Sequence, residues 1–323
     1  MRVVEATRFG GPEVLTLREV PAPSAGSGQA IVDVSVAAVL FLDTQIRQGA
    51  AQDWFRTTPP YVPGSGVAGT VTAVGQGVQP DLVGRDVVAA TAEGGSYLEQ
   101  AVVAADSLIE VPQGLGMAEA AALFTDGRTA MGLIEMADIR AEQWVLVLGA
   151  GGGLGFLLVQ LAHAAGARVI GAARGQEKLD LARKLGADAA VDYSQSDWPE
   201  RVIDITGGAG PMVVFDGVGG DIGRAGFEVT ARGGQFSAHG APSGDFAKID
   251  RKESERREIT VRGIEQVQYT PTEARRLTEL ALSAAAEGRI RPIIGQTFPL
   301  ERAADAHRAI EARETIGKTL VTI

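Results

Sequence analysis

An apolar run that passes directly into clustered glycines, at residues 145–155 (VLVLGAGGGLG), constrains this chain more than any other feature. The pattern predicts a buried strand, a tight turn and then a helix. A helix N-terminus offers bare N–H groups and a favourable dipole to an anion, and glycines let a pyrophosphate approach them. A flexible glycine loop is the alternative, but the flanking strand and helix favour a dinucleotide-binding turn. Its expected contacts are Gly151, Gly152, Gly153, Leu154 and Gly155.

The same region is apolar enough to raise the possibility of a membrane span. Residues 145–167 contain no Asp, Glu, Lys or Arg and are long enough to cross a bilayer. The glycine cluster favours a strand, turn and helix instead. We therefore expect no membrane segment. The N-terminus has no long apolar stretch, which predicts no signal peptide and a cytoplasmic location.

The strand expected next, at residues 168–172, bears on which dinucleotide is bound. Sites for NAD usually place Asp or Glu at its end, to bind the ribose 2′-hydroxyl. This chain has Ala172, Ala173 and Arg174 there, and Lys178 follows one turn into the next helix. Both cations could be ordinary solvated charges, or they could hold a 2′-phosphate. We expect the cofactor to be NADPH, with Arg174 and Lys178 as contacts.

The local patterns divide the chain into two kinds of structure. The first third consists of short β-rich runs separated by turns, which predicts a partly open barrel or sandwich. Strands and helices alternate after it, which predicts a parallel sheet with right-handed crossovers. The last 34 residues read as strand, helix and strand, and we assign them back to the first domain. The expected domains are 1–123 (catalytic, β-rich), 124–264 (Rossmann, NADPH-binding) and 265–323 (catalytic again).

Three further segments are interpreted from their local pattern. An Ala-rich helix is expected at residues 118–123 and a separate helix at 129–137. The charged run at 251–258 is interpreted as a solvated loop or a helix end.

Composition excludes several classes of function. The net charge of −10 and the pI of about 5.0 argue against nucleic acid or an anionic membrane as a partner. The chain has no cysteine, which excludes disulfides, thiolate nucleophiles and Cys-ligated zinc. With only three histidines, a multi-histidine metal site is not expected, and we predict no metal.

Several motifs, in an order that spans nearly the whole chain, resemble the medium-chain dehydrogenase/reductases. Within that superfamily the chain resembles the zinc-free quinone oxidoreductases that include ζ-crystallin. The matching segments are FGGPEVL at 9–15, Asp43-Thr44, Ile46-Arg47, PGSGVAGTV at 63–71, VGRDVV at 83–88 and GKTLV at 317–321.

This resemblance implies a fold, a set of contacts and a reaction. The fold would be a GroES-like, partly open barrel from both chain ends plus a central doubly wound Rossmann domain. Hydride would pass from NADPH to a flat acceptor held in the cleft between the domains. Relatives also often pair through the edges of their Rossmann sheets, so a homodimer is expected. The implied cofactor contacts are Thr129, Lys178, Tyr193, the segment from Phe236 to Gly240, and Lys318.

Zinc ligands are missing where zinc alcohol dehydrogenases of this superfamily carry them. Those enzymes have Cys, His-Glu and Cys at the catalytic metal, and this chain has Leu40, Ser65-Gly66 and about Thr125. Alcohol oxidation through a zinc alkoxide is therefore not expected.

The chain also departs from the quinone reductases, which usually have Asn at Leu40, Tyr at Gln45 and Gln before Gly127. Leu40 and Phe41, with Trp54 or Phe55, would form an apolar wall against the acceptor. Gln45 donates hydrogen bonds but is no acid at neutral pH. The polar candidates at the catalytic site are Asp43, Gln45 and Arg47.

Two of these polar candidates also have structural explanations. Asp43 could bond local backbone, and Arg47 could pair with a surface carboxylate.

Three functions remain open from the sequence. The first is reduction of a quinone, whose reduced anion is stabilised by delocalisation and can take its proton from water. The second is reduction of an α,β-unsaturated carbonyl, which needs a proton at the α-carbon and is disfavoured by Gln45 in place of Tyr. The third is NADPH binding with little turnover.

Overall fold

The computed structural model describes residues 1–50, 56–91 and 95–323. It divides into two compact units. The terminal unit comprises Met1–Thr125 and Thr278–Ile323, and the central unit comprises Asp126–Leu277. Both changes of unit fall inside helices, α2 (Met117–Ala137) and α8 (Pro271–Ala286). The second therefore comes later in the chain than the expected change at 264/265.

The central unit is a doubly wound parallel sheet. Its six strands lie in the order β10-β9-β8-β11-β12-β13, and every neighbouring pair is parallel. The strands are β8 (Trp144–Leu148), β9 (Arg168–Ala173), β10 (Ala189–Asp192), β11 (Val213–Asp216), β12 (Gln235–Ala238) and β13 (Thr260–Arg262). This is the Rossmann strand order, which reverses direction between β8 and β11.

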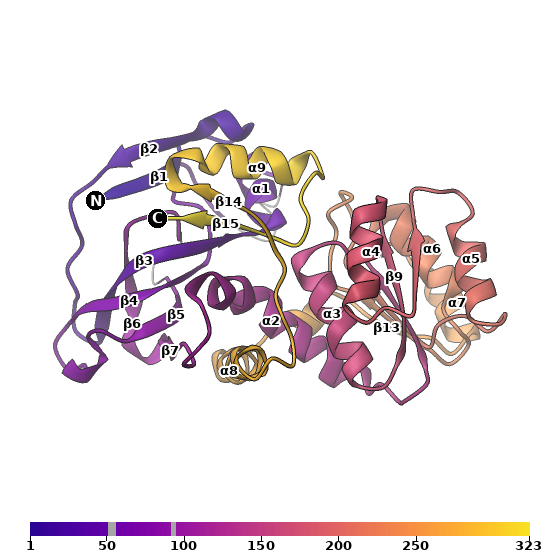
Figure 1. Cartoon of the computed structure of the whole chain (residues 1–323). Helices are drawn as coiled ribbons and strands as arrows, with labels where there is room; N and C mark the ends of the chain where they lie inside the picture. Colours follow the sequence, from indigo (N-terminus) through magenta and orange to yellow (C-terminus); the bar gives the residue numbers. More distant parts are fainter. Residues whose placement is uncertain (51–55, 92–94) are drawn as a thin grey trace. The chain divides into compact units, whose positions relative to one another are not determined.

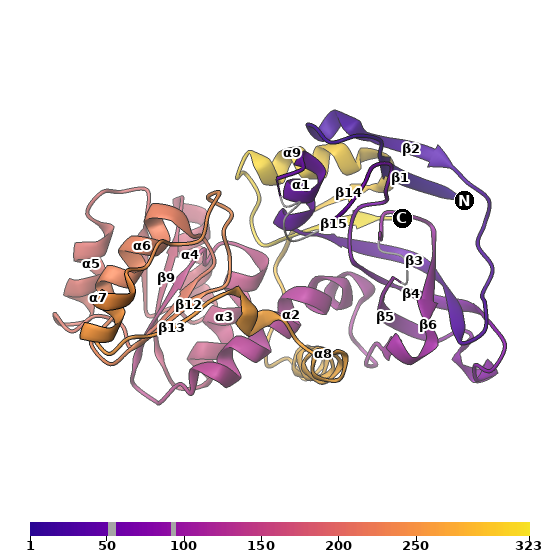
Figure 2. The same cartoon turned by 180° about the vertical axis from the view of Figure 1, so that it is seen from behind.

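Helices cover both faces of this sheet. In Figures 1 and 2, α3 and α4 lie on one face and α5 and α6 on the other. The helices are α3 (Gly153–Ala164), α4 (Gln176–Lys184), α5 (Trp198–Ile205), α6 (Gly220–Val229) and α7 (Arg251–Arg256). Because the sheet is covered on both sides, its central strands read as continuous apolar runs rather than as alternating ones.

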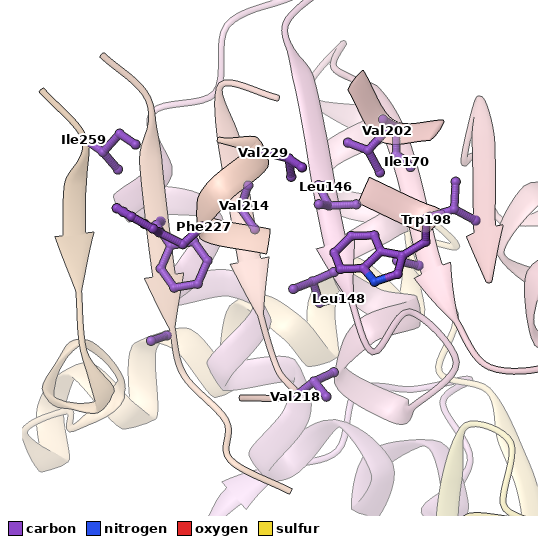
Figure 3. Close-up of a cluster of buried hydrophobic side chains, with 14 residues drawn as sticks. Leu146, Leu148, Ile170, Trp198, Val202, Val214, Val218, Phe227, Val229 and Ile259 are labelled. Atoms are coloured by element: carbon purple, nitrogen blue, oxygen red, sulfur yellow. The ribbon is translucent and has the colours of Figure 1, made fainter. Parts of the chain in front are cut away.

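The core under α5 and α6 is a cluster of buried aliphatic and aromatic side chains (Figure 3). Leu146 of β8, Ile170 of β9 and Val214 of β11 are fully buried, and Trp198 and Phe227 pack over them from the helices. Each fully buried side chain of this size stabilises the fold by about 1.5–3 kcal/mol. This packing fixes the carboxyl ends of the strands, where the predicted nucleotide contacts lie.

The terminal unit is a mainly antiparallel sheet formed by both ends of the chain. Its order is β14-β15-β3-β4-β5-β7, and β6 also pairs with β3. These strands are β3 (Gln29–Val39), β4 (Gly66–Val74), β5 (Asp86–Ala90), β6 (Gln100–Ala104), β7 (Ile109–Glu110), β14 (Ile294–Pro299) and β15 (Lys318–Thr322). A second, two-stranded sheet joins β1 (Arg2–Ala6) to β2 (Leu15–Glu19). Among its described residues the unit also contains the helices α1 (Phe41–Gln48) and α9 (Ala303–Glu311), together with the first part of α2 and the last part of α8.

The fold class predicted from the sequence is confirmed, with several local differences. The helices expected at 118–123 and 129–137 are one helix, α2, which continues through Gly127. The charged run at 251–258 contains a helix, α7, whose first turn Asp250 caps through the Lys252 N–H. Helix α1 and strand β13 were not predicted. No helix in the described part of the chain is both long and apolar enough to span a membrane.

Candidate active site

The glycine turn links β8 to α3 in the conformation that a phosphate site needs. Gly149 has a positive φ of 78°, and the N–H groups of Gly149 and Ala150 both donate to the Ala172 carbonyl at 3.0 and 2.9 Å. The turn is thereby fastened to the neighbouring strand β9. Gly153 and Leu154 then form the first turn of α3, and their backbone N–H groups belong to its N-terminus.

The glycines of this turn serve different purposes. A Cβ at Gly155 would lie 2.2 Å from the Gly149 carbonyl oxygen, so packing requires this glycine. At Gly152 φ is −93° and a Cβ would meet only the Gly149 carbonyl oxygen, at an ordinary 3.6 Å. Neither backbone conformation nor internal packing therefore requires Gly152. Its exposed backbone at the helix N-terminus fits a ligand that approaches more closely than a side chain would allow.

Lys178 lies directly over this turn. A Cβ at Gly151 would come within 2.6 Å of Lys178 Cδ, so the aliphatic stem of the lysine packs against that glycine. The half-buried side chain thus brings a positive charge from α4 to the edge of the turn. Arg174 directly follows β9 and is exposed. The assignment of both cations to a 2′-phosphate stays a prediction.

A carboxylate, Asp192, also lies at this edge, and sequence reasoning missed it. Asp192 ends β10 and stands in register with Ala173 of β9. Its side chain accepts hydrogen bonds from the Gly175 N–H at 3.3 Å and from the Ser194 N–H and hydroxyl. Partial burial opposes its charge, but these hydrogen bonds and the charge of Arg174 outweigh burial and lower the pKa of Asp192. Arg174 thus already has an ionised carboxylate near it.

The remaining predicted cofactor contacts in the central unit differ in their burial and in their partners. Tyr193 follows Asp192 and is half-buried, and Thr129 is half-buried within α2. Phe236 is a core residue whose ring packs edge to face on Phe227 at 5.7 Å, so its side chain is not available for a cofactor. Gly240 closes the predicted segment, and its N–H donates to the Asp216 carbonyl of β11.

In the terminal unit, Asp43 is a buried group at the start of α1. Its carboxylate accepts the Leu40 N–H at 2.8 Å, which satisfies a backbone donor at the helix N-terminus. Burial raises the pKa of Asp43 to about 6, although hydrogen bonds from Leu40 and Tyr97 and the charge of Lys318 favour ionisation. The hydrogen bond from Leu40 thus supports the structural explanation of Asp43, in which its carboxylate bonds local backbone. Lys318 is buried in β15 with its charge directed to Asp43.

Tyr97 continues this buried polar cluster towards α9. Its hydroxyl lies 3.0 Å from Nε2 of His307, and the two rings meet edge to face. Burial and the charge of Arg47 lower the pKa of His307 to about 3, so its imidazole is neutral at pH 7. Asp43, Tyr97 and His307 together tie α1, the segment before β6, and α9 to one another.

Two other candidates on α1 have partners of their own. Arg47 is fully buried and forms an ion pair with Glu311 at the end of α9. It therefore pairs with a carboxylate, as one of the two sequence interpretations held. Phe41 is partly buried, and the Arg313 guanidinium lies over its ring at 4.3 Å, in cation–π geometry. One face of the ring is thus covered by the protein itself.

Leu40 and Gln45, like Phe41, are partly exposed. Leu40 precedes α1 as its N-cap residue, and Gln45 lies in its middle. The other proposed members of the apolar wall, Trp54 and Phe55, lie outside the described residues.

The positions that hold zinc in related dehydrogenases offer no suitable ligand set. The space that a side chain at Gly66 would need is filled by the Phe124 ring, whose Cδ1 would lie 2.3 Å from the new Cβ. Leu40 supplies no donor atom. In the described part of the chain, no group of three or more His, Asp or Glu side chains could hold a metal ion.

Two family models match the chain, and they correspond to its two units. The Alcohol dehydrogenase GroES-like domain matches residues 26–113, and the Zinc-binding dehydrogenase model matches residues 153–283. Despite the second model's name, the chain contains no cysteine.

Curated proteins and solved structures match over the whole length. A 2-haloacrylate reductase from Burkholderia sp. is 32% identical over 97% of this chain and 96% of its own length. A quinone oxidoreductase from Pseudomonas aeruginosa is 31% identical over 98% of both. A mycobacterial protein solved with NADPH is 32% identical, with a TM-score of 0.91 and full coverage of both chains. Escherichia coli quinone oxidoreductase, also solved with NADPH, has 28% identity, full coverage of both chains and a TM-score of 0.91.

A doubly wound nucleotide-binding sheet and a GroES-like sheet, in one chain, are the two parts of a medium-chain dehydrogenase/reductase. The chain belongs to the zinc-free quinone oxidoreductase family of that superfamily. The family resemblance seen in the motifs is thereby confirmed, while the roles of individual site residues stay predictions.

Proposed function

We propose that this protein is an NADPH-dependent oxidoreductase that reduces a quinone or a similar electron-poor small acceptor without a metal. The observation that carries the proposal is the turn at Gly152, where neither packing nor backbone conformation requires a glycine. Two relatives with the same fold over their full lengths were solved with NADPH. When bound, NADPH supplies the hydride.

The chain's own residues would bind and orient. The backbone N–H groups of Gly153 and Leu154, in the first turn of α3, would hold the pyrophosphate, while the Gly152 N–H donates to the Gly149 carbonyl at 3.1 Å. Lys178 and Arg174 would hold the 2′-phosphate. Leu40 and Gln45 would contact the acceptor. Asp43 is the least suited to act as a base, because its carboxylate already accepts the Leu40 N–H and a hydrogen bond from Tyr97.

No strong acid on the protein is needed for a quinone. Hydride addition gives a hydroquinone anion, whose negative charge is delocalised and which takes a proton from water to complete the reduction. The protein then contributes proximity and orientation, which lower the entropic part of the barrier.

A second candidate, reduction of an activated carbon–carbon double bond, is favoured by one comparison. The Burkholderia relative is named for 2-haloacrylate, an α,β-unsaturated acid, and a solved 2-haloacrylate reductase covers the whole chain at 30% identity with a TM-score of 0.83. This reaction needs a proton at the α-carbon after hydride addition, and Gln45 cannot supply it as an acid. Water would have to deliver it.

Turnover assays separate the candidates. Purified protein is mixed with NADPH, and the absorbance of the reduced nicotinamide is followed with 1,4-benzoquinone, with 2-chloroacrylate and with a cyclic enone. Oxidation with the quinone alone supports the first candidate, and oxidation only with the unsaturated acid or enone replaces it by the second. Tight NADPH binding with no turnover of any acceptor would instead indicate a binding protein. We also expect a homodimer, which sedimentation equilibrium measures directly.

A further inference from the structure

His239 is a buried histidine at the carboxyl end of the central sheet. It follows β12 directly and is 8% exposed. The backbone N–H of His239 donates to the Asp216 carbonyl at 3.0 Å, and this hydrogen bond joins the ends of β12 and β11. The ring packs against Phe215 with a centroid distance of 6.4 Å. The position of the imidazole is therefore fixed by both backbone and side-chain contacts.

The hydrogen bonds around His239 determine which ring nitrogen carries the proton. The amide nitrogen of Gln266 donates to the Arg262 and Gly263 carbonyls at 3.1 and 2.7 Å, so its amide oxygen faces Ser237. The Ser237 hydroxyl donates to that oxygen at 2.9 Å. Having used its only proton, the hydroxyl can only accept from the histidine.

Nδ1 of His239 consequently carries the proton. It lies 3.2 Å from the Ser237 hydroxyl and 3.3 Å from the Ser237 carbonyl, and both positions are acceptors. Burial also lowers the pKa of His239 to about 4, so the ring is neutral at pH 7. A neutral imidazole protonated on Nδ1 has an unprotonated Nε2, which is a hydrogen-bond acceptor.

This acceptor is located at the point where the sheet changes direction. A Cβ placed on Gly217, just after β11, would lie 3.2 Å from His239 Nε2 and 3.3 Å from the Leu148 carbonyl oxygen at the end of β8. In a doubly wound sheet the dinucleotide crosses the carboxyl ends of the strands here, with its pyrophosphate on the first turn. The adenosine half would then be held at β9 and β10, and the nicotinamide half at β11 and β12.

We propose that His239 orients the nicotinamide ring by accepting an N–H hydrogen bond from its carboxamide through Nε2. The inference rests on the proposed function and extends it to one side chain of this protein. Ser237 and Gln266 are positioning residues in this arrangement, because they hold the imidazole in its acceptor form. In this tautomer Nε2 carries no proton. His239 therefore cannot donate a proton to the substrate that accepts the hydride.

A protein–ligand double-mutant cycle tests the contact. The binding of NADP⁺ is compared with that of its 3-acetylpyridine analogue, in which a methyl group replaces the amide nitrogen and removes the donor. Wild-type protein should prefer NADP⁺ by about tenfold, the usual effect of one buried hydrogen bond. In His239→Phe the two ligands should bind equally within about twofold. His163→Phe, which changes an exposed histidine of the same unit, should keep the wild-type preference.

Each result has a defined meaning. A tenfold preference that persists in His239→Phe, with normal binding and turnover of NADPH, overturns this inference alone. Failure of the wild-type protein to bind either nucleotide overturns the proposed function and this inference with it.

A measurement on the unmutated protein covers the case in which His239→Phe does not fold. With only three histidines in the chain, ¹⁵N-labelled imidazoles can be assigned individually. We expect an unprotonated Nε2 on His239 at pH 7, whose resonance shifts on adding NADP⁺ and not on adding 2′,5′-ADP, which lacks nicotinamide. A protonated Nε2, or the same shift with both ligands, would contradict the proposal.

Discussion

The carboxylate of Asp192 accepts the N–H of Gly175, and so a negative charge from β10 lies beside the turn that follows Arg174. This juxtaposition bears on the choice between NADPH and NADH. A carboxylate near the expected 2′-phosphate would repel it, while Arg174 and Lys178 attract it. The preference for NADPH is then a balance of three charges.

Neutralising Asp192 should move that balance towards NADPH. In Asp192→Asn we expect the ratio of NADH to NADPH dissociation constants to rise by about three- to tenfold, the effect of removing one like charge at a partly solvated site. Equilibrium fluorescence titration measures both constants. A ratio that falls would mean that Asp192 acts mainly by ordering the turn at Gly175.

Removing the cations should have the opposite effect. Lys178→Ala and Arg174→Ala should each weaken NADPH binding by about tenfold, because charge-assisted hydrogen bonds to phosphate are lost, and should change NADH binding much less. Lys184→Ala provides the control, since Lys184 is exposed at the far end of the same helix. Equal losses for both nucleotides would refute the assignment of these two residues.

Substitution of two glycines of the turn should separate effects on folding stability from effects on NADPH binding. Gly152→Ala should leave the free energy of unfolding almost unchanged, because the new methyl group meets only an ordinary contact, and should weaken NADPH binding by about tenfold or more. Gly155→Ala should instead lower the free energy of unfolding by about 1–3 kcal/mol, since its Cβ collides with backbone. Urea unfolding without nucleotide and titration with NADPH distinguish the two. Similar behaviour of both variants would argue against a ligand at Gly152.

The pH dependence of stability should reveal the burial of Asp43. Its pKa is about 6 in the folded protein, above its ordinary value of 3.8. Between these values the folded state binds more protons than the unfolded state, so stability falls as pH rises. The free energy of unfolding of the wild type relative to Asp43→Asn should therefore decrease from pH 4 to pH 7, by up to about 3 kcal/mol. Using the difference removes the effects of His239 and His307, which both proteins share. A flat difference would show that Asp43 titrates normally.

What could be predicted from the sequence was mostly what is encoded locally. The glycine turn and the apolar strand before it fall within eleven consecutive residues, and the structure places them as expected. Helix α1 was missed because its buried face includes polar groups, Asp43 and Arg47, whose partners Tyr97 and Glu311 are far away in the sequence. Strand β13 has only three residues, and none of them is buried.

The features of the site that were missed, namely Asp192 and the protonation form of His239, depend on contacts between distant segments. Asp192 approaches Gly175 because β10 pairs in parallel with β9, and no sequence pattern states that register. The acceptor form of His239 depends on Gln266, which comes 27 residues later. Conversely, Phe236 was selected by resemblance, and the structure commits its side chain to the core.

The pairing of β3 with β15 has a consequence for how the protein is made. Thr319 lies opposite Val39, so β3 completes its sheet only with a strand that comes 280 residues later in the chain. The six strands of the central unit, by contrast, all come from one continuous stretch of the chain. Until β15 has been synthesised, β3 lacks this neighbouring strand. Unpaired strand edges are prone to aggregate. Slow translation of the stretch before β15, or loss of β15 itself, should therefore increase the demand for chaperones more than a comparable change within the central unit.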